Sequence, residues 1–141
     1  MSAPWPATPT ATANWASAWL ALTTDNAAGY RDATVADVAA LAKLRAQAGA
    51  TAEAVRLIDV REPDEYMGEL GHIAGTALVP LATVEAAAAA WPRDAIVVMV
   101  CRSGGRSGRA AASLRAMGFA HVVNMVGGML AYNAAGLPIT R

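Results

Sequence analysis

The 141-residue sequence predicts a single α/β domain in which helices are layered on a mostly parallel sheet. Short apolar runs alternate along the chain with amphipathic or alanine-rich segments, the pattern of strands alternating with helices. Residues 95–100 (AIVVMV) contain no polar interruption, which is typical of a strand buried on both faces of a parallel sheet. In such sheets ligands bind beyond the carboxyl ends of the strands.

Each predicted element has a local signal. Thr34 and Asp37 form an N-terminal helix cap, and apolar residues at helical spacing follow it. Pro63 suits the first turn of a short helix, and Trp91–Pro92 ends an alanine-rich one. The predicted strands are 55–59, 77–79, 95–100 and 122–125, and the helices are 34–48, 63–69, 83–90, 107–117 and one that begins at 127–128.

Residues 1–30 are predicted to form an N-terminal extension, and residues 31–141 the main domain. The first 13 residues are rich in Pro, Ala and Thr, so we expect a mobile tail there. Trp15, Trp19 and Leu22 follow at positions i, i+4 and i+7, on one face of a short helix. This apolar stripe predicts either packing onto the domain or a contact with a partner.

Composition excludes several function classes. The formal net charge is zero, so no basic field attracts nucleic acid or an anionic membrane surface. The chain has neither the basic start of a signal peptide nor an apolar run of about 20 residues, and we expect a soluble, cytoplasmic protein. Cys101 is the only cysteine and the two histidines lie far apart, so we expect no disulfide, metal site or cofactor.

The segment CRSGGRS, which begins at Cys101, directly follows the most apolar predicted strand. Gly104 and Gly105 allow the backbone to curl with its amides inward, ahead of a helix expected to begin about six residues after the cysteine. Arg102 and Arg106 add positive charge. Amides and cations of this kind lower a thiol pKa, which predicts a nucleophilic thiolate at Cys101. The alternative is that Cys101 is a small buried residue that ends the strand.

Three ordered motifs resemble the rhodanese family. Residues 57–81 (LIDVREPDEYMGELGHIAGTALVPL) are similar to its opening signature, and CRSGGRS is similar to its catalytic loop. VVNMVGGMLAYNAAGLPI resembles its closing segment, with Tyr132 where many members have Trp. The resemblance covers residues 33–141, apart from an apparent lengthening by residues 68–70. It implies a doubly wound domain with a central parallel sheet of about five strands and helices on both faces.

The resemblance also implies a function. Cys101 matches the nucleophile that takes the outer sulfur of thiosulfate, or of a persulfide donor, and passes it to cyanide or another thiol. A sulfur-relay protein is a possible partner. Asp59 and Arg61 are expected to support the site. The residues expected to hold the anionic sulfur or the donor are Arg102, Ser103, Gly104, Gly105, Arg106 and Ser107.

Other interpretations remain open. Asp59, Arg61 and Glu65 form either a charged network that fixes the following helix or part of the anion pocket. His72 is expected to be a hydrogen-bonded structural residue rather than a base. A thiol redox sensor or interaction module is an alternative function. A phosphatase or arsenate reductase is another, but related enzymes of that kind have one more residue between the cysteine and the arginine.

Overall fold

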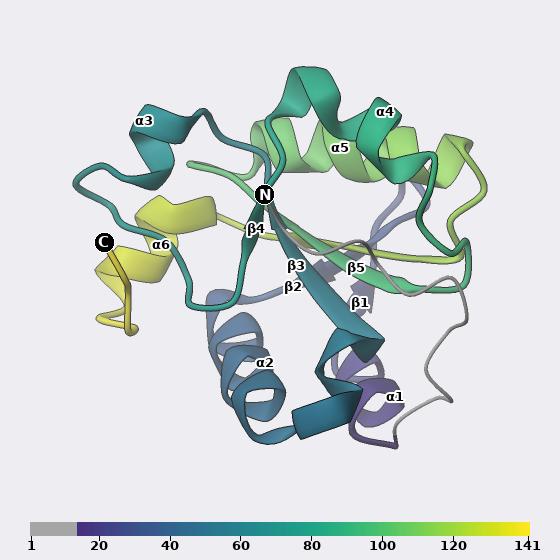
Figure 1. Cartoon of the computed structure of the whole chain (residues 1–141), viewed down its shortest axis with the longest axis horizontal. Coiled ribbons are helices and arrows are strands. Elements are labelled where there is room, and N and C mark those ends of the chain that lie inside the picture. Colours follow the sequence, from purple (N-terminus) through teal and green to yellow (C-terminus); the bar gives the residue numbers. More distant parts are fainter. Residues whose placement is uncertain (1–13) are drawn as a thin grey trace.

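The computed structural model describes residues 14–141, which form a six-stranded sheet of order β1-β2-β6-β5-β3-β4 (Figure 1). The expected tail, residues 1–13, lies outside the described residues. β1 pairs antiparallel to β2, and the other five strands are parallel, which confirms the predicted sheet. The strands are β1 (Thr24–Asp25), β2 (Arg31–Ala33), β3 (Val55–Asp59), β4 (Ala77–Leu78), β5 (Ile96–Val100) and β6 (His121–Met125).

Helices cover both faces of the sheet, as expected. Helices α4 and α5 lie on one face, α1 and α2 lie on the other, and α3 and α6 lie at one end of the molecule (Figure 1). None of the helices of residues 14–141 is long and apolar enough to cross a membrane. The helices are α1 (Asn14–Leu20), α2 (Val35–Gln47), α3 (Pro63–Tyr66), α4 (Val84–Ala88), α5 (Gly105–Ala116) and α6 (Gly128–Ala134), with 3-10 turns η1 (Gly49–Ala54) and η2 (Leu81–Thr83).

The central strand β5 separates two apolar cores. Val97 and Met99 pack with residues of α4 and α5, whereas Val98 and Val100 pack with residues of α1, α2 and α6. All five residues of β5 are buried, because a strand in the middle of a parallel sheet contacts helices on both sides. Side chains alternate along a strand, so Cys101 continues the row of Val97 and Met99 toward α5.

The N-terminal helix α1 packs onto the domain, which confirms the first interpretation of its tryptophans. Trp19 is 1% exposed, and its indole N–H donates to the Asp37 carbonyl at 2.8 Å. Trp15 donates to the Thr51 hydroxyl at 3.0 Å. The placement of Leu22 on the same face was wrong, because α1 ends at Leu20 and Leu22 is 60% exposed. The division between residues 30 and 31 stays a prediction.

Two helix starts show how local chemistry sets the element boundaries. The Thr34–Asp37 capping box at the start of α2 is confirmed, with bonds of 3.0 and 3.2 Å. The predicted start of α5 near Ser107 was wrong, since the helix begins at Gly105. Gly104 adopts the left-handed conformation with φ +101°, and its carbonyl accepts the first helical bond at 3.0 Å. Arg106 and Ser107 therefore lie in the first turn of α5.

Candidate active site

Cys101 lies at the carboxyl end of β5, where parallel sheets bind ligands. The residue is 1% exposed and belongs to the apolar core under α4 and α5. Arg102, Ser103 and Gly105 next to it are exposed. The cysteine loop, residues 101–107, thus has a surface rim and a buried thiol at its base.

The sulfur of Cys101 accepts hydrogen bonds from the loop that follows it. The Gly104 amide donates to Sγ at 3.1 Å, and the Ser107 hydroxyl lies 3.2 Å from Sγ. Burial raises the pKa of the thiol. Hydrogen bonds from the Ser107 side chain and from the amides of Ser107, Gly104 and Ser103 together lower the pKa by more than burial raises it, so the net shift is downward. This arrangement favours the thiolate that the sequence predicted.

Helix α6 holds the cysteine loop in this shape from the outside. The Met129 amide donates to the Cys101 carbonyl at 2.8 Å, and the Leu130 amide donates to the Arg102 carbonyl at 3.0 Å. Gly128 permits this approach, because a Cβ there would lie 2.4 Å from the Arg102 carbonyl carbon and oxygen. With these carbonyls bound to α6, the amides of the loop are free to face the sulfur.

The two arginines of the loop differ in their surroundings. Arg102 is exposed, and none of the ion pairs found among residues 14–141 includes it. Arg106 donates from both Nη atoms to the two carboxylate oxygens of Glu65, each at 2.7 Å. This bidentate bond is the main reason why the pKa of Glu65 is lowered to about 2. The role of Arg106 in binding a donor stays a prediction.

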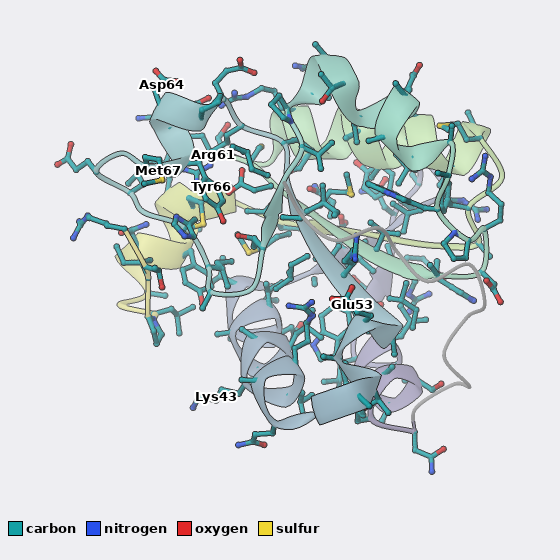
Figure 2. All side chains as sticks on the ribbon, viewed as in Figure 1. Lys43, Glu53, Arg61, Asp64, Tyr66 and Met67 are labelled. Atoms are coloured by element: carbon teal, nitrogen blue, oxygen red, sulfur yellow. The ribbon has the colours of Figure 1, made fainter. Side chains whose placement is uncertain are left out.

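Asp59 and Arg61 form a buried ion pair at the carboxyl end of β3. The Arg61 Nη2 lies 2.8 Å from an Asp59 oxygen, and its guanidinium also donates to the carbonyls of Glu65 and Gly71. These bonds confirm that Asp59 and Arg61 fix the segment after β3, but Glu65 joins them only through its backbone carbonyl, because its carboxylate pairs with Arg106. Figure 2 shows Arg61 near α3, at the end of the molecule away from α1. Whether the pair also supports catalysis stays a prediction.

His72 is a structural residue, as predicted. Its Nδ1 lies 3.0 Å from the Tyr66 carbonyl oxygen, and its ring stacks on that of Tyr66 with centroids 3.8 Å apart. Its backbone pairs with Thr140 near the C-terminus. These contacts tie the lengthened segment around residues 68–70 to the end of the chain.

Sequence reasoning missed one residue that contacts the site, Asn124 of β6. Its Oδ1 lies 2.6 Å from the Ser107 hydroxyl, and its Nδ2 lies 3.4 Å from the Gly104 carbonyl. A signal for it was present, because Asn124 is the one polar side chain within the apolar run 122–126. A buried amide in a strand core needs partners, and here the partners belong to the cysteine loop.

A cavity of about 690 Å³ lies away from the cysteine loop, at the opposite ends of the strands, and is lined among others by Ala16, Pro92 and His121. Within residues 14–141, no group of three or more His, Cys, Asp or Glu side chains could hold a metal ion.

Comparisons with known proteins point the same way. The sequence profile described as Rhodanese-like domain matches residues 38–135. The chain is 38% identical over 90 residues to a sulfurtransferase of Allochromatium vinosum, covering 64% of this chain and 82% of that protein. It is 37% identical over 89 residues to the uncharacterized protein slr1261 of Synechocystis, covering 63% of this chain and 49% of that protein. It is 39% identical over 77 residues to the putative sulfur carrier protein YrkF of Bacillus subtilis, covering 55% of this chain and 40% of that protein.

A solved structure extends the likeness to the N-terminal elements. A protein of unknown function from Rhodopseudomonas palustris, named as a possible tyrosine phosphatase, matches with a TM-score of 0.64 at 25% identity. The match covers 94% of this chain and 99% of that one, more than residues 31–141 alone. By contrast, the chain spans about half the length, or less, of two of the relatives above.

Proposed function

Because this chain belongs to the rhodanese-like domain family, we propose that it is a sulfurtransferase that carries sulfur on Cys101 as a persulfide. The family and the relative named sulfurtransferase support sulfur transfer in general. The observation that carries the proposal is the pair of donors, the Gly104 amide and the Ser107 hydroxyl, directed at the buried sulfur. Hydrogen-bond donors directed at an anionic nucleophile stabilise its charge and lower its pKa.

In the first step the Cys101 thiolate attacks the outer sulfur of thiosulfate. A bond forms between Sγ and that sulfur, the original S–S bond of thiosulfate breaks, and sulfite leaves with the electron pair. The negative charge moves from Sγ to the outer sulfur of the new persulfide. A persulfide donor reacts in the same way, with a thiolate as the leaving group.

In the second step a thiolate or cyanide attacks the outer sulfur of the persulfide. The bond between Sγ and the outer sulfur breaks, and its electron pair returns to Sγ as the thiolate. The products are the acceptor's persulfide or thiocyanate. Neither step consumes an external oxidant or reductant, and we propose that the reaction takes place in the cytoplasm, where thiols stay reduced.

We assign the binding of the donor to the rim of the cysteine loop. Arg102 is an exposed cation beside the thiol and matches the negative charge of a sulfonate group. Arg106 is held by Glu65 of α3. Ser103, Gly104 and the remaining loop amides bind the anionic sulfur in this proposal.

An apolar rim beside the loop favours a protein as the physiological partner. Four large apolar side chains in residues 14–141 are exposed, and three of them lie on or next to α3 and α6, which bond to the cysteine loop. They are Met67 just after α3 (Figure 2), Val126 between β6 and α6, and Leu130 on α6. Apolar surface of this kind is typical of a contact with another protein. The replacement Met67→Asp is therefore expected to slow sulfur transfer to a protein acceptor but not to cyanide. Leu22→Asp, at the exposed apolar residue outside this rim, serves as the control.

Mass spectrometry tests the central claim. After incubation with thiosulfate and removal of excess reagent, the wild-type protein should gain roughly 32 Da, one sulfur atom, on Cys101. Cys101→Ser should gain nothing, and released sulfite should match the persulfide in amount. Absence of the added mass with both thiosulfate and a small persulfide donor would refute the assignment.

The alternatives predict different chemistry. A redox sensor would react faster with peroxide than with sulfur donors and would form a sulfenic acid at Cys101. A phosphatase would hydrolyse an aryl phosphate, but the bidentate bond to Glu65 occupies the arginine that would hold a phosphoryl group. Measuring all three activities on one preparation separates these functions.

A further inference from the structure

The hydroxyl of Ser107 faces three acceptors but has one proton. The three acceptors are the Cys101 sulfur at 3.2 Å, the Gly104 carbonyl at 3.2 Å and Asn124 Oδ1 at 2.6 Å. The contacts to the sulfur and to Asn124 are buried, since Ser107 is 0% exposed and Asn124 6% exposed. Water therefore does not supply a second donor, and the three acceptors compete for one proton.

The shortest of these contacts is the one to Asn124. Its Oδ1 faces Ser107, because its Nδ2 is then directed at the Gly104 carbonyl, an acceptor 3.4 Å away. A distance of 2.6 Å between two oxygens requires a proton between them. When Cys101 becomes a thiolate, the charged sulfur is the stronger acceptor, so the Ser107 hydroxyl donates to Sγ and its short bond to Asn124 breaks.

We propose that Asn124 is a positioning residue that competes with Cys101 for the Ser107 proton and thereby balances the thiolate against the persulfide. In the thiolate, Ser107 donates to Sγ. In the persulfide, the charge lies on the outer sulfur, so the Ser107 hydroxyl donates to Asn124 Oδ1 again. The buried hydroxyl therefore has an acceptor in both states. The statement about the persulfide rests on the proposed function. The statement about the thiolate rests on the geometry alone.

The proposal predicts opposite effects for two residues that bond to each other. Ser107→Ala removes a donor to the thiolate and should raise the Cys101 pKa by about one unit. Asn124→Ala removes the competing acceptor, releases the proton toward Sγ, and should lower the Cys101 pKa by roughly half a unit. A residue that merely held Ser107 in place would raise the pKa when replaced, as Ser107→Ala does.

The measurement is the rate of Cys101 alkylation by iodoacetamide as a function of pH. Asn124→Leu, which keeps the volume without an acceptor, serves as a second variant, and thermal unfolding checks that each variant is folded. Asn133→Ala is the matched control, since Asn133 donates only to the carbonyls of Leu70 and Met129. The Asn124→Ala shift should disappear in a Ser107→Ala background, because the effect passes through that hydroxyl.

A second measurement concerns the persulfide. At pH 9 and a fixed ratio of thiosulfate to sulfite, Asn124→Ala should lower the equilibrium amount of persulfide about threefold, which corresponds to half a pKa unit. Shifts of the same sign in the two single variants, no shift, or a shift that persists without Ser107 would overturn the inference and leave the proposed function standing. Failure of the wild type to form a persulfide would overturn the proposed function, while opposite shifts in alkylation would still support competition for the proton.

Discussion

Replacing Glu65 by Gln removes the charge that faces Arg106 while keeping the size of the side chain. In the folded protein the pKa of Glu65 is about 2 rather than 4.5, chiefly because its carboxylate accepts two bonds from Arg106. Shielded from water, a difference of this size would correspond to about 3 kcal/mol of stability. The two side chains are 30% and 26% exposed, so solvent screens the pair and we expect about 1 kcal/mol.

The pH dependence gives the sign of the effect. Because folding lowers the pKa of Glu65, the ion pair stabilises the fold above pH 4.5, and that stabilisation is lost as the pH falls toward 2. Chemical denaturation at pH 7 should show Glu65→Gln about 1 kcal/mol less stable than wild type. Asp64→Asn, an exposed carboxylate on the same helix, should be unchanged (Figure 2). At pH 3 the deficit of Glu65→Gln should shrink by more than half.

The same variant reports on the cysteine loop. Without the carboxylate of Glu65, Arg106 keeps its charge but loses its anionic partner, so it is free to attract a doubly charged donor. The KM for thiosulfate should fall, whereas Asp64→Asn should leave it unchanged. Equal stability of the two variants at pH 7, or a deficit of Glu65→Gln that is as large at pH 3 as at pH 7, would refute the ion-pair reasoning.

Three other predictions follow from the packing and the charges. Alkylation of Cys101 should reach half its maximal rate at a pH below 9.0, the ordinary pKa of a thiol, because the pKa of Cys101 is lowered in the folded protein. The stabilisation of the fold by the thiolate is then present above pH 9 and is lost as the pH falls through the folded-state pKa. A half-maximal rate at or above pH 9 would contradict the hydrogen bonds to the sulfur. Gly128→Ala should lose about 3 kcal/mol or more in denaturation and release the cysteine loop, whereas Gly136→Ala, with a similar φ but open space, should lose about 1 kcal/mol; equal losses would show that the close contact is unimportant. Trp19→Ala should lose about 3–5 kcal/mol and Leu22→Ala no more than about 0.5 kcal/mol, and a mild Trp19→Ala would mean that α1 is not part of the core.

Much of the fold could be predicted because its signals are local. The capping box at Thr34, the proline that opens α3 and the apolar run of β5 each involve residues within a few positions of one another. Strands β1 and β2 were missed for the same reason. They have two and three residues, carry exposed or charged side chains and exist only because β2 pairs with β6, about 90 residues later in the chain.

The site divides in the same way. The sequence by itself determined that a lone cysteine follows the central strand and precedes a glycine-rich turn into a helix, because strand, turn and helix are contiguous and each is encoded within its own segment. Only the tertiary structure decided that Glu65 binds Arg106 across 41 positions, that Asn124 reaches Ser107 across 17, and that Gly128 packs on the loop. Those contacts depend on the order of the strands in the sheet and on the packing of α3 and α6, which residues close together in the chain do not encode.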